Sequence, residues 1–140
     1  MQYLSAAPQL CHLFLDTHPY NAHTVAAEML YRGLPILTLP GKHMASRVAF
    51  SLIKSLELEE DLAATSEQDY IDKAVSFPSD ESKYKRIREV LLEKALGKQV
   101  PAYNAVSFSA NFFQLLTSAW SRKIMSQFFN TSQSSFKEEL

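Results

Sequence analysis

The sequence predicts an α/β fold in which one βαβ unit is followed by a run of C-terminal helices. Two short apolar runs, 11–15 and 36–39, are typical of parallel strands that are covered on both faces. Between them, residues 24–32 have a helical pattern, with Gly33 placed to end the helix and Pro35 just beyond it. Two strands joined by one helix predict a right-handed crossover between parallel strands.

Length, composition and charge narrow the classes of protein to which this chain can belong. The chain has 140 residues, of which 46% are apolar and 21% charged, as in one ordinary globular domain. Its 14 basic and 15 acidic residues give a net charge of -1, so we expect no nucleic-acid partner. No apolar run is long enough to span a bilayer and the N-terminus lacks signal-peptide features, so we expect no membrane partner and a cytoplasmic, possibly also nuclear, location.

Residues after the second strand predict helices. A helix over 45–56 has one apolar face, formed by Val48, Ala49, Leu52, Ile53 and Leu56. A connector follows, with a candidate third strand at 62–64. Ser66 and Asp69 resemble a capping box for a helix over 67–77, whose apolar face is Tyr70, Ile71, Ala74 and Val75.

Two further helices complete the predicted set. Ser79 is placed to cap a helix over 80–96, with a buried stripe of Tyr84, Ile87, Leu91 and Ala95 and with Gly97 ending it. A long helix from about Ala105 has one face formed by Phe108, Phe112, Leu115, Leu116 and Ala119. We interpret the aromatic residues as core rather than as base-stacking platforms, and the lone Cys11 as a small buried residue.

The predicted organisation is one folded region with short ends. Residues 1–9 are an irregular lead-in, 10–129 the folded lobe and 130–140 a polar, frayed tail. Two strands make a poor sheet. We therefore expect further strands upstream in a longer protein, and self-association through unpaired strand edges if the chain stands alone.

The chemistry is expected in the loop that joins the first strand to the helix. Ligands collect beyond the carboxyl ends of parallel strands, and a helix N-terminus attracts phosphate. Thr24 either caps the helix or contacts a phosphate, and Glu28, one turn further on, is either a solvated carboxylate or a partner of ribose hydroxyls. His23 is either a structural loop residue or part of this site.

Other chemical motifs are absent from the sequence. The 3 glycines form no phosphate loop, and there is no HExxH, CxxC or G-x-S-x-G motif. After the second strand come His43, Ser46 and Arg47, which either line the same crevice or belong to a solvated loop and helix start. A nucleotide or another phosphate-bearing ligand over residues 21–25 is therefore the hypothesis that the residues alone support.

The stretch FLDTHPYNAHTVAAEMLYRGLPILTLPGKHMASRVAFSLI resembles the carboxyl-terminal lobe of the O-linked N-acetylglucosamine transferase and SPINDLY family. Its specific core is LDTxPYNxHT, then Gly-x-Pro before the second strand, then PG followed by ASRVA, and the likeness covers about residues 10–120. The resemblance implies a partial, Rossmann-like lobe of a GT-B glycosyltransferase. Such enzymes transfer sugar to Ser and Thr of intracellular proteins and usually carry tetratricopeptide repeats upstream.

The resemblance also implies a set of nucleotide-sugar-binding residues. In the family a His-Thr-Thr segment contacts the donor diphosphate and an acidic residue contacts the ribose. The residues of this chain that match are Asn21, His23, Thr24, Val25 and Glu28. Three positions depart from the pattern, because Val25 replaces the second Thr, Ala22 replaces a Gly and Glu28 replaces the usual Asp.

The implied reaction is inverting transfer of N-acetylglucosamine from UDP-N-acetylglucosamine, with no cofactor and no metal. The alternatives are a fragment of a GDP-fucose-using O-fucosyltransferase, a non-catalytic relic or interaction module of the same fold, and a free-standing nucleotide-binding protein. No catalytic residue of the family falls in this chain, so we expect the 140 residues alone to be inactive. The implied partners are protein Ser/Thr acceptors and, upstream, the amino-terminal lobe and the repeat domain.

Overall fold

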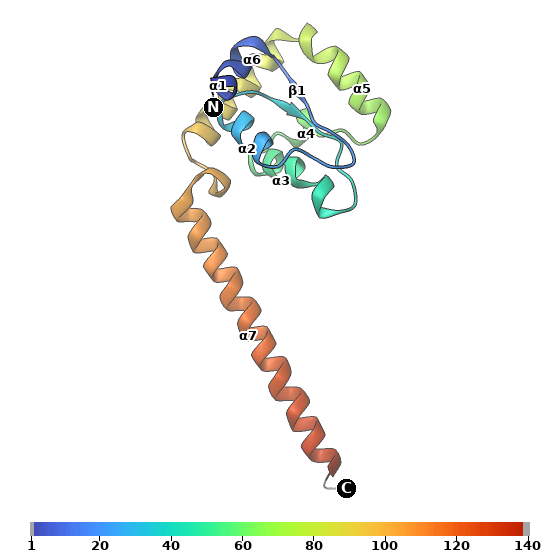
Figure 1. The fold of residues 1–140 in the computed structure, drawn as a ribbon, viewed down its shortest axis with the longest axis vertical. Coiled ribbons are helices and arrows are strands. Elements are labelled where there is room, and N and C mark those ends of the chain that lie inside the picture. Colours follow the sequence, from blue (N-terminus) through green and yellow to red (C-terminus); the bar gives the residue numbers. More distant parts are fainter. Residues whose placement is uncertain (1, 139–140) are drawn as a thin grey trace. The chain divides into compact units, whose positions relative to one another are not determined.

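The computed structural model describes residues 2–138, and their side chains are described for residues 6–126. The chain divides into two compact units, Met1–Asn104 and Ala105–Leu140. The first unit holds the sheet and the shorter helices, and the second is a single helix, α7 (Figure 1).

Short helices around a very small sheet make up the first unit. The α-helices are α1 Gln2–Leu10, α2 Thr24–Tyr31, α3 Val48–Ser55, α4 Glu59–Leu62, α5 Glu67–Ser76 and α6 Glu81–Val90. The other helical turns are η1 Met44–Ser46, η2 Phe77–Ser79, the π-helix η3 Leu91–Leu96 and η4 Pro101–Tyr103. The strands are β1 Phe14–Leu15 and β2 Ile36–Leu37, and α7 of the second unit spans Ala105–Glu138.

The two strands form the predicted parallel pair, joined by α2. Phe14 lies opposite Ile36 and Leu15 opposite Leu37. Beyond β2 an isolated parallel bridge joins Thr38 to Ala63, so β2 has a neighbour on each side, whereas among residues 2–138 no second strand pairs with β1. The predicted strands over 11–15 and 36–39 are thus present but shorter, and the third strand predicted at 62–64 is reduced to this one bridge, because α4 ends there.

Helix α2 has the predicted end. Gly33 follows it with a φ of 81°, a left-handed conformation that glycine adopts without strain. Its N–H donates to the Leu30 carbonyl at 3.0 Å. A Cβ at this position would also lie 3.2 Å from Leu92 Cδ2, so the turn sits close against η3.

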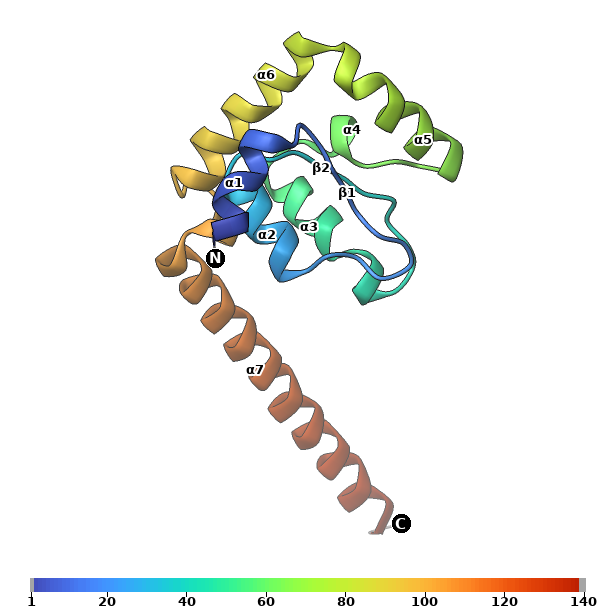
Figure 2. The same ribbon diagram turned by 45° about the horizontal axis from the view of Figure 1, so that its top comes forward.

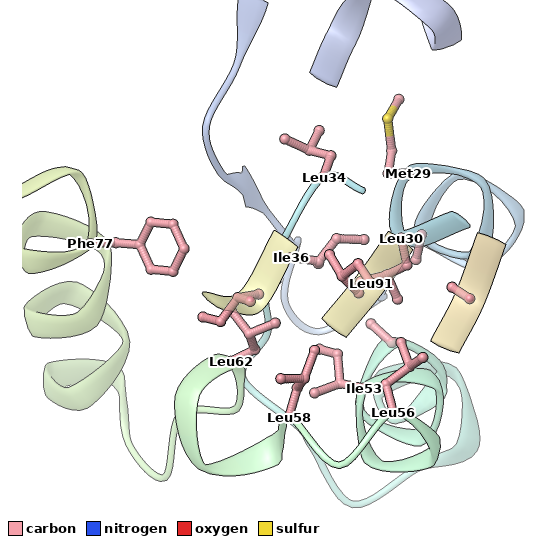
Figure 3. Packing of buried hydrophobic residues seen from close by; sticks show 14 residues of the cluster. Met29, Leu30, Leu34, Ile36, Ile53, Leu56, Leu58, Leu62, Phe77 and Leu91 are labelled. Atoms are coloured by element: carbon pink, nitrogen blue, oxygen red, sulfur yellow. The ribbon is translucent and has the colours of Figure 1, made fainter. Parts of the chain in front are cut away.

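The core is one cluster that gathers side chains from every layer. Figure 3 shows Leu91 of η3 between Leu30 of α2 and Ile53 of α3, with Ile36 of β2 beside them. Each of these side chains is fully buried. Burying an aliphatic side chain of this size stabilises the folded state by roughly 1.5–3 kcal/mol. The apolar faces predicted for the helix over 45–56 and for the helix over 80–96 are therefore confirmed.

The start of the chain differs from the prediction. Residues predicted as an irregular lead-in, 1–9, lie largely within α1, which packs against α2. Pro8 lies inside this helix, a residue that usually ends one. Cys11, predicted to be buried, is exposed, because it follows the end of α1 and precedes β1 rather than lying within the strand.

The helix predicted over 80–96 is interrupted. It divides into α6 and the π-helix η3, and its cap is Asp80 rather than Ser79, since the Asp80 carboxylate accepts the Lys83 N–H at 2.9 Å. Gly97 ends the helix as predicted, at the C-cap position of η3 with a φ of -69°, and the Lys98 that follows it has a left-handed φ of 56°.

Apolar side chains on α5 and α7 are not core. Ile71 and Val75 of α5 are exposed, although Ser66 caps that helix as predicted by accepting the Asp69 N–H at 3.1 Å. On α7, described by itself, Phe108 and Trp120 are also exposed, against the interpretation of the aromatics as core. The helix continues to Glu138, through most of the segment predicted as a frayed tail.

Candidate functional site

Two loops meet at the carboxyl ends of the strands. The loop after β1 lies beside the loop after β2 in both views (Figures 1 and 2). The Ala45 carbonyl joins them, because it accepts the Asn21 N–H at 2.9 Å and the Nε2–H of His23 at 3.3 Å. This edge of the sheet is where an α/β fold places a ligand.

The contact with Ala45 fixes how His23 can act. A carbonyl oxygen only accepts, so Nε2 must carry a proton. Nδ1 is left to accept from a ligand, or to donate to one if the ring is protonated. Tyr20 stacks on the imidazole, with ring centroids 4.8 Å apart and planes 20° apart, which further holds its orientation.

Helix α2 begins with unpaired donors. His23 occupies the N-cap position, but its side chain does not cap the helix. The first described backbone bond runs from the Ala27 N–H to the His23 carbonyl at 3.1 Å, so within residues 2–138 no bond is described for the N–H groups of residues 24–26. Thr24 is therefore the first helical residue rather than the cap. Its side chain is exposed, as is that of Val25. This end of α2 is suited to an anion.

Thr24 and Glu28 lie on one side of α2, one turn apart, and line the same cavity of about 330 Å³. The remaining lining residues are Ala27, Tyr31, Arg32, Ala102 and Tyr103. The Tyr103 hydroxyl donates to the Ala27 carbonyl at 3.2 Å, and burial raises the pKa of this phenol above its ordinary value. The cavity thus combines a hydroxyl, a carboxylate and aromatic walls.

Asn21 has a different setting from the other predicted site residues. Its side chain is 1% exposed, and its Nδ2 donates to the Thr17 carbonyl at 3.1 Å. No described residue donates to its Oδ1. It does not line the cavity of Thr24 and Glu28, so it holds the loop from within.

Sequence comparison identifies the family. A model of the family described as Glycosyl transferase family 41 matches residues 6–112, which include the whole of the loop and cavity described above. The chain belongs to glycosyl transferase family 41. The resemblance seen in the sequence is thereby confirmed.

Individual members of family 41 match most of this chain. It is 34% identical over 116 residues to a probable UDP-N-acetylglucosamine–peptide N-acetylglucosaminyltransferase SPINDLY of Solanum lycopersicum, covering 83% of this chain and 12% of that protein. It is 39% identical over 72 residues to the UDP-N-acetylglucosamine–peptide N-acetylglucosaminyltransferase of Caenorhabditis elegans, covering 51% and 6%. The chain thus spans about an eighth or less of the length of these relatives.

A solved structure supports the fold. A mutant O-GlcNAc transferase of Thermobaculum terrenum matches with a TM-score of 0.68 and 31% identity, over 87% of this chain and 22% of that one. The predicted fold class, a partial α/β lobe of GT-B type, is confirmed. In the described part of the chain, no helix has the length and apolar character needed to cross a membrane.

The loop after β2 holds the remaining predicted residues of this family 41 chain. Ser46 is buried and its hydroxyl donates to the His43 carbonyl at 2.9 Å. The Arg47 guanidinium donates to the Gly41 carbonyl at 2.9 Å and lies over the Phe50 ring. These contacts shape the loop, and none of His43, Ser46 and Arg47 lines the cavity of Thr24 and Glu28.

Tyr103 and Asp16 of the candidate site were not predicted from the sequence. Tyr103 lies between the helix predicted over 80–96 and the one predicted from Ala105, and nothing local signals its contact with α2, 76 positions away. Asp16 is part of the LDTxPYNxHT motif, but the sequence assigned it no role in the site. Its side chain is 6% exposed, and a carboxylate directly after a buried strand is the signal that was available.

Proposed function

We propose that this chain is the nucleotide-sugar-binding part of a protein O-glycosyltransferase that transfers N-acetylglucosamine from UDP-N-acetylglucosamine to Ser or Thr of proteins. The observation that carries the proposal is the shared cavity of Thr24 and Glu28 beside the uncapped start of α2. The names of the relatives in Solanum lycopersicum and Caenorhabditis elegans supply the donor and the peptide acceptor.

In this proposal the chain stabilises the leaving group. The acceptor hydroxyl attacks the anomeric carbon and gives its proton to a base on another part of the longer protein. The bond from that carbon to the diphosphate oxygen breaks, and negative charge grows on the diphosphate, which leaves as UDP. The N–H groups at the start of α2, the Thr24 hydroxyl and His23 stabilise this charge. Such electrostatic stabilisation of the transition state is often the largest single contribution to lowering an activation barrier. Glu28 accepts hydrogen bonds from the ribose hydroxyls.

The departures from the family pattern are compatible with binding. Val25 lacks a hydroxyl, but its backbone N–H remains at the start of the helix. Losing one hydrogen bond costs about 1 kcal/mol net, or roughly a fivefold loss of affinity. At position 22, where the family has Gly, the backbone N–H donates to the Asp16 carboxylate at 2.7 Å. A ligand therefore does not depend on this N–H as a donor, whether or not the methyl group of Ala22 is present.

The groups that activate the acceptor belong, in this proposal, to other parts of a longer protein. They would lie on an amino-terminal lobe, with tetratricopeptide repeats further upstream, and the 140 residues alone would bind nucleotide without transferring sugar. No cofactor or metal is required. An intracellular location, cytoplasmic or also nuclear, goes with intracellular protein acceptors.

A titration of the ¹⁵N-labelled chain tests the proposal. We expect UDP to shift the backbone amide signals of residues 23–28, in the millimolar range because only half of a site is present. Stronger shifts with GDP than with UDP would favour the fucose donor. No saturable shift with either nucleotide would overturn the proposal and favour a non-catalytic module of the same fold.

A further inference from the structure

The buried carboxylate of Asp16 stands where the loop leaves β1. Its Oδ1 accepts the Thr17 N–H at 3.0 Å and the Ala22 N–H at 2.7 Å, so one oxygen closes both ends of the loop. Its Oδ2 accepts the Thr38 hydroxyl at 2.6 Å, just beyond β2. The Tyr70 hydroxyl of α5 donates to the Asp16 carbonyl at 2.9 Å.

We propose that Asp16, together with Thr38, is the positioning residue of the nucleotide-diphosphate site. This inference rests on the proposed function. Asp16 does not need to touch the ligand. It fixes Ala22, which directly precedes His23, and so sets where α2 begins and where its free N–H groups point.

The charge of Asp16 fits this role. Burying a carboxylate is costly unless it is well hydrogen-bonded, and bonds to an ionised acceptor are about twice as strong as neutral ones. None of the hydrogen bonds described for Asp16 comes from Lys or Arg, so its partners are two loop amides and one hydroxyl. The interactions of the carboxylate therefore serve to fix the conformation of the loop.

Thr38 links Asp16 to the residues that follow β2. It is fully buried, and its backbone is fixed on both sides, because its N–H donates to the Leu62 carbonyl at 3.0 Å and its carbonyl accepts the Ala64 N–H at 2.8 Å. Its hydroxyl is thus a rigid anchor for Oδ2. Through Asp16, the loop after β1 is therefore anchored to Thr38, whose backbone is hydrogen-bonded on both sides.

Three variants at the loop and one control variant in the core separate positioning from general stability. Asp16→Ala removes every acceptor, whereas Asp16→Asn keeps an oxygen for both amides and can donate from its NH₂ to the Thr38 hydroxyl. Thr38→Val removes the anchor while keeping the volume. Ile53→Val is the matched control, because it thins the core without touching the loop.

Two readouts are measured on the full 140-residue chain at a temperature where each variant is folded. One is UDP affinity by amide shifts, and the other is hydrogen exchange of the amides of residues 17 and 22. We expect Asp16→Ala to weaken UDP binding about tenfold or more and to speed exchange at both amides. We expect Thr38→Val to do the same to a smaller degree, Asp16→Asn to remain within about threefold, and Ile53→Val to change neither.

The outcomes are distinguishable. Unchanged UDP affinity and unchanged exchange in Asp16→Ala and Thr38→Val would overturn the positioning role while leaving the proposed function intact. If Asp16→Ala does not fold, Thr38→Val and Asp16→Asn decide the question by the same criteria. An equal loss of UDP affinity in Ile53→Val would show that the effect is one of stability, and would also overturn the positioning role. A wild-type chain that does not bind UDP would refute the proposed function and this inference with it.

Discussion

Tyr103 is the last residue of η4 and contacts α2, where its hydroxyl donates to the Ala27 carbonyl. Burial raises the pKa of this phenol in the folded chain, whereas in the unfolded chain it ionises near pH 10. Above about pH 10 the unfolded state loses this proton while the folded state keeps it, so the stabilisation that Tyr103 provides is complete below pH 10 and falls above it.

We expect the free energy of unfolding to decrease between pH 9 and 11, and to decrease less in Tyr103→Phe. Urea unfolding at pH 9, 10 and 11 measures the difference. Tyr70 also has a raised pKa, caused first by burial and then by the Asp16 charge, so the comparison between wild type and variant matters rather than the slope of either alone. Identical slopes would contradict the burial of the Tyr103 phenol.

Glu28 is the carboxylate that faces the cavity. A carboxylate that accepts from ribose hydroxyls loses the charge-assisted part of those bonds when it becomes an amide. We expect Glu28→Gln to weaken UDP binding roughly threefold to tenfold, measured by amide shifts. Glu60→Gln is the matched control on an exposed carboxylate away from this cavity and should leave UDP affinity unchanged. Equal affinities in wild type and Glu28→Gln would remove Glu28 from the site.

At the scale of elements, Leu91 and Leu92 are neighbours in η3 with opposite settings. Leu91 is fully buried between α2 and α3, whereas Leu92 is 38% exposed. We expect Leu91→Ala to lower the free energy of unfolding by about 2–5 kcal/mol through lost burial and a residual cavity. Leu92→Ala should cost clearly less. Chemical denaturation of both variants measures this, and similar losses would contradict the placement of η3.

The helical elements were largely predictable because burial follows the 3.6-residue period. Ile87, Leu91 and Ala95 were expected on one face and all three are buried. The π turn was not predictable, since the same residues also fit an α-helix and only the packing of α2 against η3 distinguishes the two. Gly97 nevertheless ends the helix as expected, and the left-handed residue Lys98 follows it.

The lengths of the strands and the long-range contacts of the candidate site could not be predicted from local sequence patterns. An apolar run predicts a strand, but pairing decides its length, and β1 pairs over only two residues. The candidate site was inferred from Thr24 and Glu28, which are close in sequence and share a helix face. Asp16 with Thr38 and Tyr103 with Ala27 are joined over 22 and 76 positions, and spacing along the chain carries no signal for such contacts.

At the scale of the whole chain, the first unit has its own core, and no described side chain of α7, up to residue 126, is part of it. Large apolar side chains on α7 are exposed, among them Trp120 at 67%. Because exposed apolar surface of this kind promotes association, we expect a chain ending at Asn104 to unfold cooperatively and to self-associate less than the full chain. Analytical ultracentrifugation and thermal unfolding measure both properties.

A matched variant separates α7 from the strand edge. Phe112→Ser with Phe113→Ser in the full chain should reduce association without changing the core, because both side chains are exposed. Association that persists in the shortened chain would point instead to the unpaired edge of β1, where Leu15 is exposed. Loss of cooperative unfolding on shortening would contradict the division into two units.

The most direct test of the central claim compares UDP with uridine on the same ¹⁵N-labelled chain. If the start of α2 holds a diphosphate, UDP shifts the amides of residues 23–26 and uridine does not, while both affect Glu28 because both carry a ribose. The UDP shifts should also weaken as salt is raised. The same shifts with uridine as with UDP, or none at residues 23–26 with either, would contradict a diphosphate site on this helix.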